Sequence, residues 1–288
     1  MPQNPHCYRA AALSLSEGDC LRPDWPAPAK VHALCSTRTG GVSRAAFASM
    51  NLGDHVGDAP EAVQTNRQRL QATLAQVTPG ARPVFLQQVH GTQVVELVPD
   101  LADGVCADAA LTAHTGLACT VMVADCLPVL ITDRAGRAVA AAHAGWRGLL
   151  GGVLEAVLAR FCPLALMDKA SDAIGSRAPL DPAEVLVWLG PCIGPQAFEV
   201  GAEVRAAFCA TDPQAAACFV PQAGNRFLAD LPGLARQRLA ALGVQSVFGN
   251  DGSDAWCTVA QSSRFFSHRL AGGRAGGTGR MAACIWIG

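Results

Sequence analysis

Hydrophobic residues along the chain fall into short continuous runs that are typical of strands buried on both faces. Turn-forming residues separate the runs, and residues 133–136 are expected to join two neighbouring strands. One run is interrupted by His90 and Gly91, which predicts a strand, a turn and a second strand. The predicted strands cover residues 31–38, 83–97, 117–133, 137–145, 185–194, 245–251 and 280–288.

Other segments repeat their apolar residues at the spacing of a helix. In residues 59–77, the spacing of Val63, Leu70 and Leu74 places them on one face. Asp58 precedes this segment and Asp230 precedes another, so both are expected to be N-caps. Helices are therefore predicted at 59–77, 146–161, 196–208 and 231–243.

The order of these elements predicts the fold class. Strands alternate with helices, but some neighbouring strands are hairpin-like, which favours a single α/β or α+β domain with a mixed sheet. Residues 1–30 are rich in proline and are expected to be an irregular N-terminal segment, so the domain would span 31–288. Residues 163–183 show no clear period and are expected to form an exposed insertion.

Composition narrows the classes of function. The chain has 22 Lys and Arg against 23 Asp and Glu, so we expect no nucleic-acid partner. It has no apolar run of membrane-spanning length and no secretion signal, so neither a membrane partner nor export is expected. Twelve cysteines occur without a CxxC pair, which favours reduced thiols and a cytoplasmic location. The glycine-rich segment 272–280 lacks the GK[ST] signature of a phosphate loop.

Three residues stand out as candidate metal ligands. His90 and His143 each end a predicted strand, each has a glycine nearby, and Cys126 lies late in a third apolar strand. Two imidazoles and a thiolate with one open position are typical of catalytic zinc sites, and the same donors suit copper. The long spacings match no compact metal motif, so two alternatives stay open at this point. The residues could be core packing, or Cys126 could be a nucleophile with a histidine base.

Ordered sequence blocks then give a resemblance. QQVHGTQVV, ADCLPVLITD, AAHAGWRGLLGGV and GPCIGPQAFEVG, with STRTGGVS, SMNLGDHVGD and TGRMAACIWIG, resemble the bacterial laccase-domain family. Its members are described as purine nucleoside phosphorylases, polyphenol oxidases or peptidoglycan editing factors. The resemblance runs from about residue 31 to the end of the chain. It implies a mixed-sheet sandwich with flanking helices, like that of the cytotoxic necrotizing factor.

The resemblance implies that His90, Cys126 and His143 hold zinc, with copper as the alternative. It also implies phosphorolysis of adenosine, inosine, guanosine and S-methyl-5′-thioadenosine, and deamination of adenosine. The partners would be a purine nucleoside and phosphate, and the chain would be a monomer or a small homo-oligomer. Copper-dependent polyphenol oxidation, and a cell-wall editing role with Cys126 as nucleophile, are the alternatives.

Further site residues are expected on the same blocks. Asp125 is expected to orient a ligand or carry a proton, which would make it catalytic with Cys126 and Arg38. Arginine binds phosphate through two parallel hydrogen bonds, so Arg38 and Arg147 are the predicted phosphate ligands. The remaining predicted substrate-binding residues are Asn51, His55 and His268. The block TVAQSSRFFSHR at 258–269 also resembles the family, but its residues 260–263 match loosely, which leaves substrate preference open.

Overall fold

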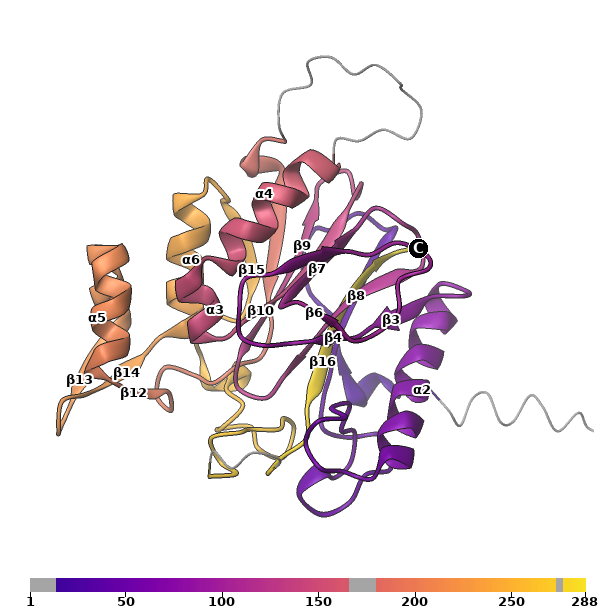
Figure 1. The fold of residues 1–288 in the computed structure, drawn as a ribbon, viewed down its shortest axis with the longest axis horizontal. Helices are drawn as coiled ribbons and strands as arrows, with labels where there is room; N and C mark the ends of the chain where they lie inside the picture. Colours follow the sequence, from indigo (N-terminus) through magenta and orange to yellow (C-terminus); the bar gives the residue numbers. More distant parts are fainter. Residues whose placement is uncertain (1–13, 166–179, 273–276) are drawn as a thin grey trace, which may run out of the picture.

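Two mixed β-sheets form the centre of the molecule (Figure 1). The computed structural model describes residues 14–165, 180–272 and 277–288. The first sheet has five strands in the order β1-β2-β16-β8-β3, and only β3 and β8 are parallel. Its strands are β1 (Cys20–Leu21), β2 (Val31–Ser36), β3 (Arg82–Val84), β8 (Leu117–Val123) and β16 (Met281–Ile287).

The second sheet has six strands in the order β15-β11-β9-β10-β7-β5. Its two outer pairs, β15 with β11 and β5 with β7, are parallel, and the inner pairs are antiparallel. Its strands are β5 (Val94–Glu96), β7 (Ala109–Thr112), β9 (Leu127–Asp133), β10 (Val139–Ala144), β11 (Val185–Leu189) and β15 (Ser246–Gly249). Mixed sheets of this kind confirm the predicted fold class.

Hydrophobic residues divide the molecule into four layers. One cluster, which includes Cys35, Leu130 and Ile285, lies between the two sheets. Leu70 and Leu74 of helix α2 (Pro60–Val77) pack on the outer face of the first sheet. Helices α3 (Trp146–Gly151), α4 (Val153–Ala165) and α6 (Leu231–Ala241) cover the second sheet on the opposite side (Figure 1). The arrangement is helix, sheet, sheet, helix, which is the predicted sandwich.

Two smaller sheets complete the fold. Strands β12 (Glu199–Gly201), β14 (Arg226–Ala229) and β13 (Phe219–Gln222) form a three-stranded sheet beside helix α5 (Ala202–Thr211). This unit projects from one end of the molecule (Figure 1). Strands β4 (Leu86–Gln87) and β6 (Val105–Cys106) form a parallel pair. The sequence pattern did not predict the strands β7, β13 and β14.

The prediction of one strand over residues 117–133 is wrong. The chain forms β8, breaks at residues 124–126, and continues as β9 in the other sheet. Both strands are fully buried, so their apolar residues read as one continuous run. Asp125 has a φ of 91°, which a strand does not accommodate. Cys126 therefore lies in a crossing between sheets and not late in a strand.

Helix boundaries also differ from the prediction. Ala59, and not Asp58, is the N-cap of α2, and the Asp58 carboxylate accepts from Asn51 instead. The segment after residue 146 forms two helices, because Gly152 adopts a left-handed conformation between α3 and α4. The segment 196–208 begins as strand β12 before α5 starts. Asp230 caps α6 by accepting from the Gly233 amide, as predicted.

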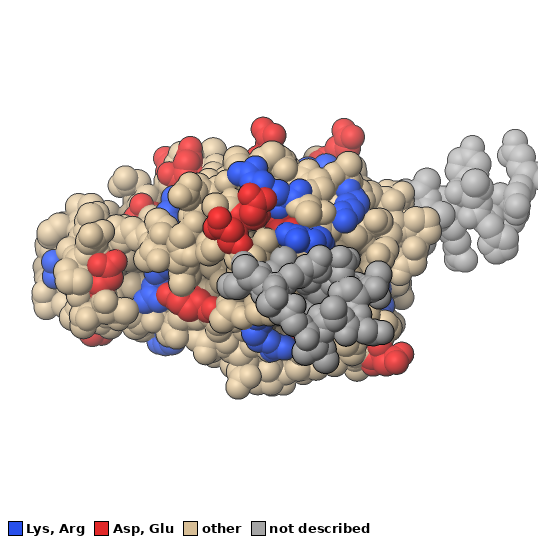
Figure 2. Space-filling view, turned by 90° about the horizontal axis from the view of Figure 1, so that it is seen from above, with Lys and Arg blue, Asp and Glu red and all other residues tan. Residues whose placement is uncertain are grey.

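The two peripheral segments are only partly described. Residues 20–21 of the proline-rich segment form strand β1 and pair with β2, so this segment is not wholly irregular. Most of the expected insertion, residues 166–179, lies outside the described residues. No helix among the described residues is both long and apolar enough to cross a membrane. On the face seen in Figure 2, acidic and basic side chains lie interspersed, in keeping with the net charge of −1.

Candidate functional site

Cys126 lies where the chain crosses from the first sheet to the second. Strand β9 begins at the next residue and pairs with β10 so that Leu127 faces Ala144 and Pro128 faces His143. This register places Cys126 beside the end of β10, next to His143 and Gly145. The antiparallel pairing of β9 and β10 therefore brings together two residues that are separated by 17 positions in the sequence.

His143 is the penultimate residue of β10 and is buried, with 3% of its surface exposed. Its Nδ1 lies 2.8 Å from a carboxylate oxygen of Asp108, which is itself fully buried. Strand β7 pairs with β10 at Ala109 and Ala142, so Asp108 lies opposite His143 across the ladder. A carboxylate on Nδ1 fixes the ring so that Nε2 is the nitrogen left for a ligand.

His90 lies in a loop after β4, not at the end of a strand, and it has a φ of 61°. Asp108 holds this loop as well, because its carboxylate accepts from the backbone amides of Val89, His90 and Gly91. One buried carboxylate thus holds the backbone of the His90 loop and the ring of His143. Asp108 was not predicted from the sequence, because it stands alone in the segment CADAALT without any motif around it.

The predicted ligand atoms of His90, Cys126 and His143 lie within 4.8 Å of one another. The Cys126 Sγ is 3.7 Å from the His90 Nε2. Gly145 leaves the room for this cluster, since a Cβ at that position would lie 2.9 Å from the Cys126 sulfur. His90 is exposed, Cys126 is half-buried and His143 is buried, so the cluster opens to solvent on the His90 side.

Electrostatics favour a thiolate at Cys126. Burial alone would raise the pKa of this thiol, but the His143 imidazole and a hydrogen bond with His90 outweigh burial and lower it. The pKa of His143 shifts the opposite way: burial would lower it, but Cys126 and Asp108 raise it above its ordinary value. Hydrogen bonds from His143 and Gly91 overcome burial and lower the pKa of Asp108. The thiolate is the form that binds metals.

The donor set and its surroundings fit a metal ion. Two imidazoles and a thiolate are ligands that zinc and copper both accept, and three protein ligands leave a position for substrate or water. The carboxylate behind His143 is the outer-shell partner that metal-bound histidines usually have. The geometry therefore supports a metal site at the three predicted residues, and it is equally compatible with either metal.

The three candidate ligands share a cavity of about 200 Å³ with His55, Gln88, Met122, His268 and Arg280. His55 and His268 were predicted as substrate-binding residues, and both do line the cavity. Gln88 and Arg280 were not predicted as site residues from the sequence. Both lie inside family blocks, QQVHG and TGRMAACIWIG, and those blocks were the available signal.

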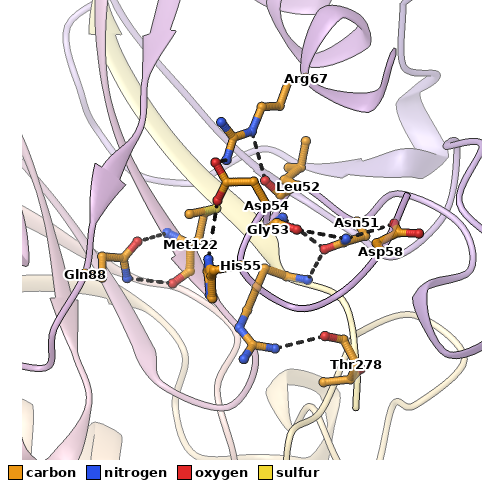
Figure 3. Close-up of polar contacts among 11 residues, drawn as sticks. Asn51, Leu52, Gly53, Asp54, His55, Asp58, Arg67, Gln88, Met122 and Thr278 are labelled. Carbon is orange, nitrogen blue, oxygen red and sulfur yellow. Dashed lines mark hydrogen bonds and ion pairs between the residues drawn. The ribbon is translucent and has the colours of Figure 1, made fainter. Parts of the chain in front are cut away.

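His55 and Gln88 also line an adjoining cavity of about 570 Å³, with Asp54 and Arg67 on its wall. Figure 3 shows Asp54 between Arg67 and His55, and its carboxylate lies 3.1 Å from the guanidinium and 3.5 Å from the imidazole. The two shared residues make the cavities neighbours. A ligand larger than the first cavity has room to extend past His55.

Asp125 lies behind the site. One of its carboxylate oxygens accepts from the Thr258 hydroxyl and the other accepts from the Arg269 amide at 2.7 Å. Its carbonyl accepts from the Ile193 amide. Asp125 thus ties the crossing that carries Cys126 to the segment that carries His268. It is 9% exposed and does not line the cavity, so this arrangement suits the predicted orienting role better than the proton-carrying one.

Three other predicted residues also lie outside the cavity lining. The Arg38 guanidinium donates to the carbonyls of Ala48 and Ser262 and packs on the Phe266 ring. The Asn51 amide is fully buried and donates to Gly53 and Asp58. Arg147 is exposed and stacks on the Trp146 ring, 4.4 Å from its centroid. The first two join loops around the site, and the third lies at the start of α3.

Comparison with known proteins gives one family description and a different name for the relatives. A model of the family described as multi-copper polyphenol oxidoreductase laccase matches residues 32–288. A Pseudomonas aeruginosa protein named as a purine nucleoside phosphorylase is 50% identical over 268 residues, which are 93% of this chain and 98% of that protein. An Escherichia coli protein, purine nucleoside phosphorylase YfiH, is 48% identical over 92% of this chain and 97% of its own length.

Solved structures agree with the fold. A crystal structure of a Neisseria meningitidis protein matches with a TM-score of 0.79 and 46% identity, over 93% of this chain and 99% of that one. The crystal structure of YlmD from Geobacillus stearothermophilus also gives a TM-score of 0.79, at 29% identity, over 96% of this chain and 98% of that one. Both matches cover nearly the whole four-layer sandwich.

Proposed function

We infer that this chain is a purine nucleoside phosphorylase. It belongs to the family described as multi-copper polyphenol oxidoreductase laccase, and its Pseudomonas aeruginosa and Escherichia coli relatives are named purine nucleoside phosphorylases. The observation that carries the proposal is the convergence of His90, Cys126 and His143 in one cavity. The substrates proposed are adenosine, inosine, guanosine and S-methyl-5′-thioadenosine. The domain that performs the reaction would span residues 31–288.

Zinc is the metal that we propose for the three ligands, with copper as the alternative. A bound zinc ion would supply a Lewis acid and lower the pKa of a coordinated water. The chain's own residues prepare the site for it: Asp108 holds the His90 loop and the His143 ring, and Gly145 leaves room beside the sulfur. The low pKa of the Cys126 thiol supports binding at neutral pH, because the metal then competes with fewer protons.

Phosphorolysis requires a phosphate oxygen to bond to C1′ of the ribose while the bond from C1′ to the purine nitrogen breaks. The electron pair of that bond stays with the base, which takes up the proton that phosphate gives away. The site supports this reaction by holding both reactants in one hollow, which removes much of the entropic cost of bringing them together. The adjoining cavity past His55 gives a nucleoside the length that it needs.

Adenosine deamination is the second activity proposed for the same site. Water adds at C6 of the purine and ammonia leaves, so the product is inosine and no phosphate is consumed. The open side of the ligand cluster, next to the exposed His90, supports this reaction because water reaches it directly.

Two other functions remain as alternatives, each with one observation in its favour. The family description favours copper-dependent oxidation of phenols. The lowered pKa of Cys126 beside His143 favours a cysteine nucleophile, as a cell-wall editing factor would need. Metal content and sensitivity to chelators separate these alternatives, because a nucleophilic cysteine would stay active after the metal is removed.

The proposed setting is the cytoplasm, with small-molecule partners and neither nucleic acid nor membrane. The cysteines that the structure describes are all free thiols, which supports a reducing compartment. The proposed assembly is a monomer or a small homo-oligomer.

The first experiment combines metal analysis with product analysis. Wild type and Cys126→Ala are analysed for zinc and copper, and each is incubated with adenosine or inosine, with and without phosphate. We expect about one zinc per chain and phosphate-dependent release of the free base in wild type, and loss of both in Cys126→Ala. Metal-free wild type with full activity, or a variant that keeps metal and turnover, would contradict the proposal.

A further inference from the structure

We propose that Arg280 is the residue that binds inorganic phosphate in the cavity of the three ligands. The inference rests on the proposed function and moves the phosphate site away from Arg38 and Arg147. Arg280 immediately precedes strand β16, and its side chain lines the same cavity as His90, Cys126 and His143.

One edge of the Arg280 guanidinium is held by hydrogen bonds, and its other N–H groups are available to a ligand. The Nη1 group donates to the carbonyls of Thr278 and Gly279 at 3.0 and 3.2 Å, and the backbone amide donates to Asn51. Among the described residues, Arg280 forms no ion pair, and neither its Nε nor its Nη2 donates a hydrogen bond. A guanidinium fixed at one edge offers its remaining donors to a ligand without losing much side-chain entropy.

The two arginines predicted from the sequence are engaged elsewhere. Two backbone carbonyls and an aromatic ring occupy the Arg38 guanidinium. Arg147 is exposed and lies over Trp146. Arg280 is the arginine among the described residues that line the cavity of the three ligands. The cation that phosphate needs is therefore present, but it comes from the last strand and not from the first block.

The neighbours of Arg280 in the cavity also favour an anion. His55 and His268 line the same cavity, and the buried Nδ1 of His268 has no hydrogen-bond partner among the described residues. An imidazole N–H at either position is a further donor for a phosphate oxygen. Burial lowers the pKa of Arg280, and the charges of Cys126 and Asp125 oppose that shift, but no ion pair joins either group to Arg280. No Asp or Glu is among the described residues that line this cavity.

Phosphate held at Arg280 is placed to react. It shares the cavity with the three ligands, so one of its oxygens can approach a ribose C1′ that lies within the same hollow. The new bond forms between that oxygen and C1′, and the bond from C1′ to the base breaks. The base keeps the electron pair and takes up the proton that the phosphate gives away. Arg280 stabilises the phosphate charge and does not itself exchange a proton.

The test compares Arg280→Gln and Arg280→Lys with wild type, using inosine and inorganic phosphate. Loss of a charged, hydrogen-bonded contact is expected to raise the KM for phosphate by about 10- to 100-fold in Arg280→Gln. The KM for inosine should change less than twofold. Arg280→Lys should fall between the two, because lysine keeps the charge and loses the paired donors. Arg226→Gln is the control, an exposed arginine on the distant strand β14.

Several outcomes overturn the inference. An unchanged KM for phosphate in Arg280→Gln does so, provided that the variant keeps the metal content of wild type. If wild type shows no phosphorolysis, the proposed function fails, and calorimetric titration with inorganic phosphate then tests the site by itself. Binding that is present in wild type and lost in Arg280→Gln upholds the site. Binding of adenosine monophosphate but not of inorganic phosphate assigns Arg280 to a substrate-borne phosphoryl group and overturns it.

Discussion

At the scale of single residues, the site depends on the absence of one methyl group. Gly145 has a φ of −64°, which alanine adopts without strain. A Cβ there would lie 2.9 Å from the Cys126 sulfur and 3.1 Å from the His90 ring. Overpacking of this kind costs about 1–3 kcal/mol. We therefore expect Gly145→Ala to weaken metal binding by about tenfold or more, as measured by competition with a chromophoric chelator.

Gly18→Ala is the matched control, because a Cβ at Gly18 meets no atom closer than 4.0 Å. Unchanged metal affinity in Gly145→Ala would mean that the segments carrying Cys126 and His90 move apart easily. The close approach of Gly145 to these two residues would then have no functional meaning.

Asp108 allows a second test of how a single residue affects metal affinity. It accepts from three amides of the His90 loop and contacts the His143 Nδ1. Asp108→Asn keeps the size of the side chain but removes the charge, and outer-shell changes of this type cost about 10- to 100-fold in metal affinity. The measurement is a metal titration with zinc and with copper. Asp100→Asn, a change at an exposed carboxylate outside the cavity lining, should leave the affinity unchanged.

The convergence of His90, Cys126 and His143 could be predicted from the sequence because histidine and cysteine are rare and their chemistry is specific. Asp108 and Arg280 could not, because an isolated carboxylate or arginine has many roles, and only the pairing of β7 with β10 or the shape of the cavity reveals its use. Arg38 illustrates the opposite case, in which the contacts of a residue in the fold are hidden from the sequence. Its residue type suits phosphate, but nothing in the sequence showed that Ala48 and Ser262 would occupy its donors.

At the scale of elements, the Gln88 side chain joins the His90 loop to strand β8 through hydrogen bonds of the kind that a neighbouring backbone would make. The Gln88 amide donates to the Met122 carbonyl at 2.8 Å and accepts from the Met122 amide at 2.7 Å (Figure 3). This pair of bonds imitates one rung of a sheet beside the crossing that carries Cys126. Gln88 therefore fixes the distance between two segments that each supply a ligand.

Gln88→Glu tests this connection with minimal change of shape. The carboxylate can still accept from the Met122 amide, but it cannot donate, and it faces the Met122 carbonyl as a second acceptor. We expect metal affinity to fall by about tenfold, while Gln87→Glu, an exposed neighbour, leaves it unchanged. Equal affinities in the two variants would show that the loop is held by Asp108 alone.

The break between β8 and β9 shows why element boundaries were harder to predict than element types. Both strands lie in the interior, so neither has the alternation that would reveal a change of sheet. The small sheet of β12, β13 and β14 was missed for a different reason. Strand β13 carries Pro221 and is largely exposed after Phe219, so it lacks the apolar run typical of a strand.

At the scale of the whole molecule, the site lies where the two sheets exchange the chain. Cys126 belongs to the crossing from the first sheet to the second, and His143 belongs to the second sheet. Arg280 leads into β16, which lies in the first sheet. The cavity is therefore formed jointly by both halves of the sandwich, and a metal that bridges its ligands would hold those halves together.

Metal removal should therefore lower the thermal stability of the whole chain. A ligand that binds only the folded state at about 100 times its Kd stabilises that state by about 2.7 kcal/mol, which corresponds to roughly 4–5 °C in Tm for a chain of 288 residues. We expect a chelator to lower the Tm of wild type by several degrees and to leave Cys126→Ala unchanged. Calorimetry measures both, and restoring zinc to wild type should reverse the shift. A chelator effect that persists in Cys126→Ala would place the stabilising metal away from His90 and His143, because that variant has lost the only thiolate of the cluster described here.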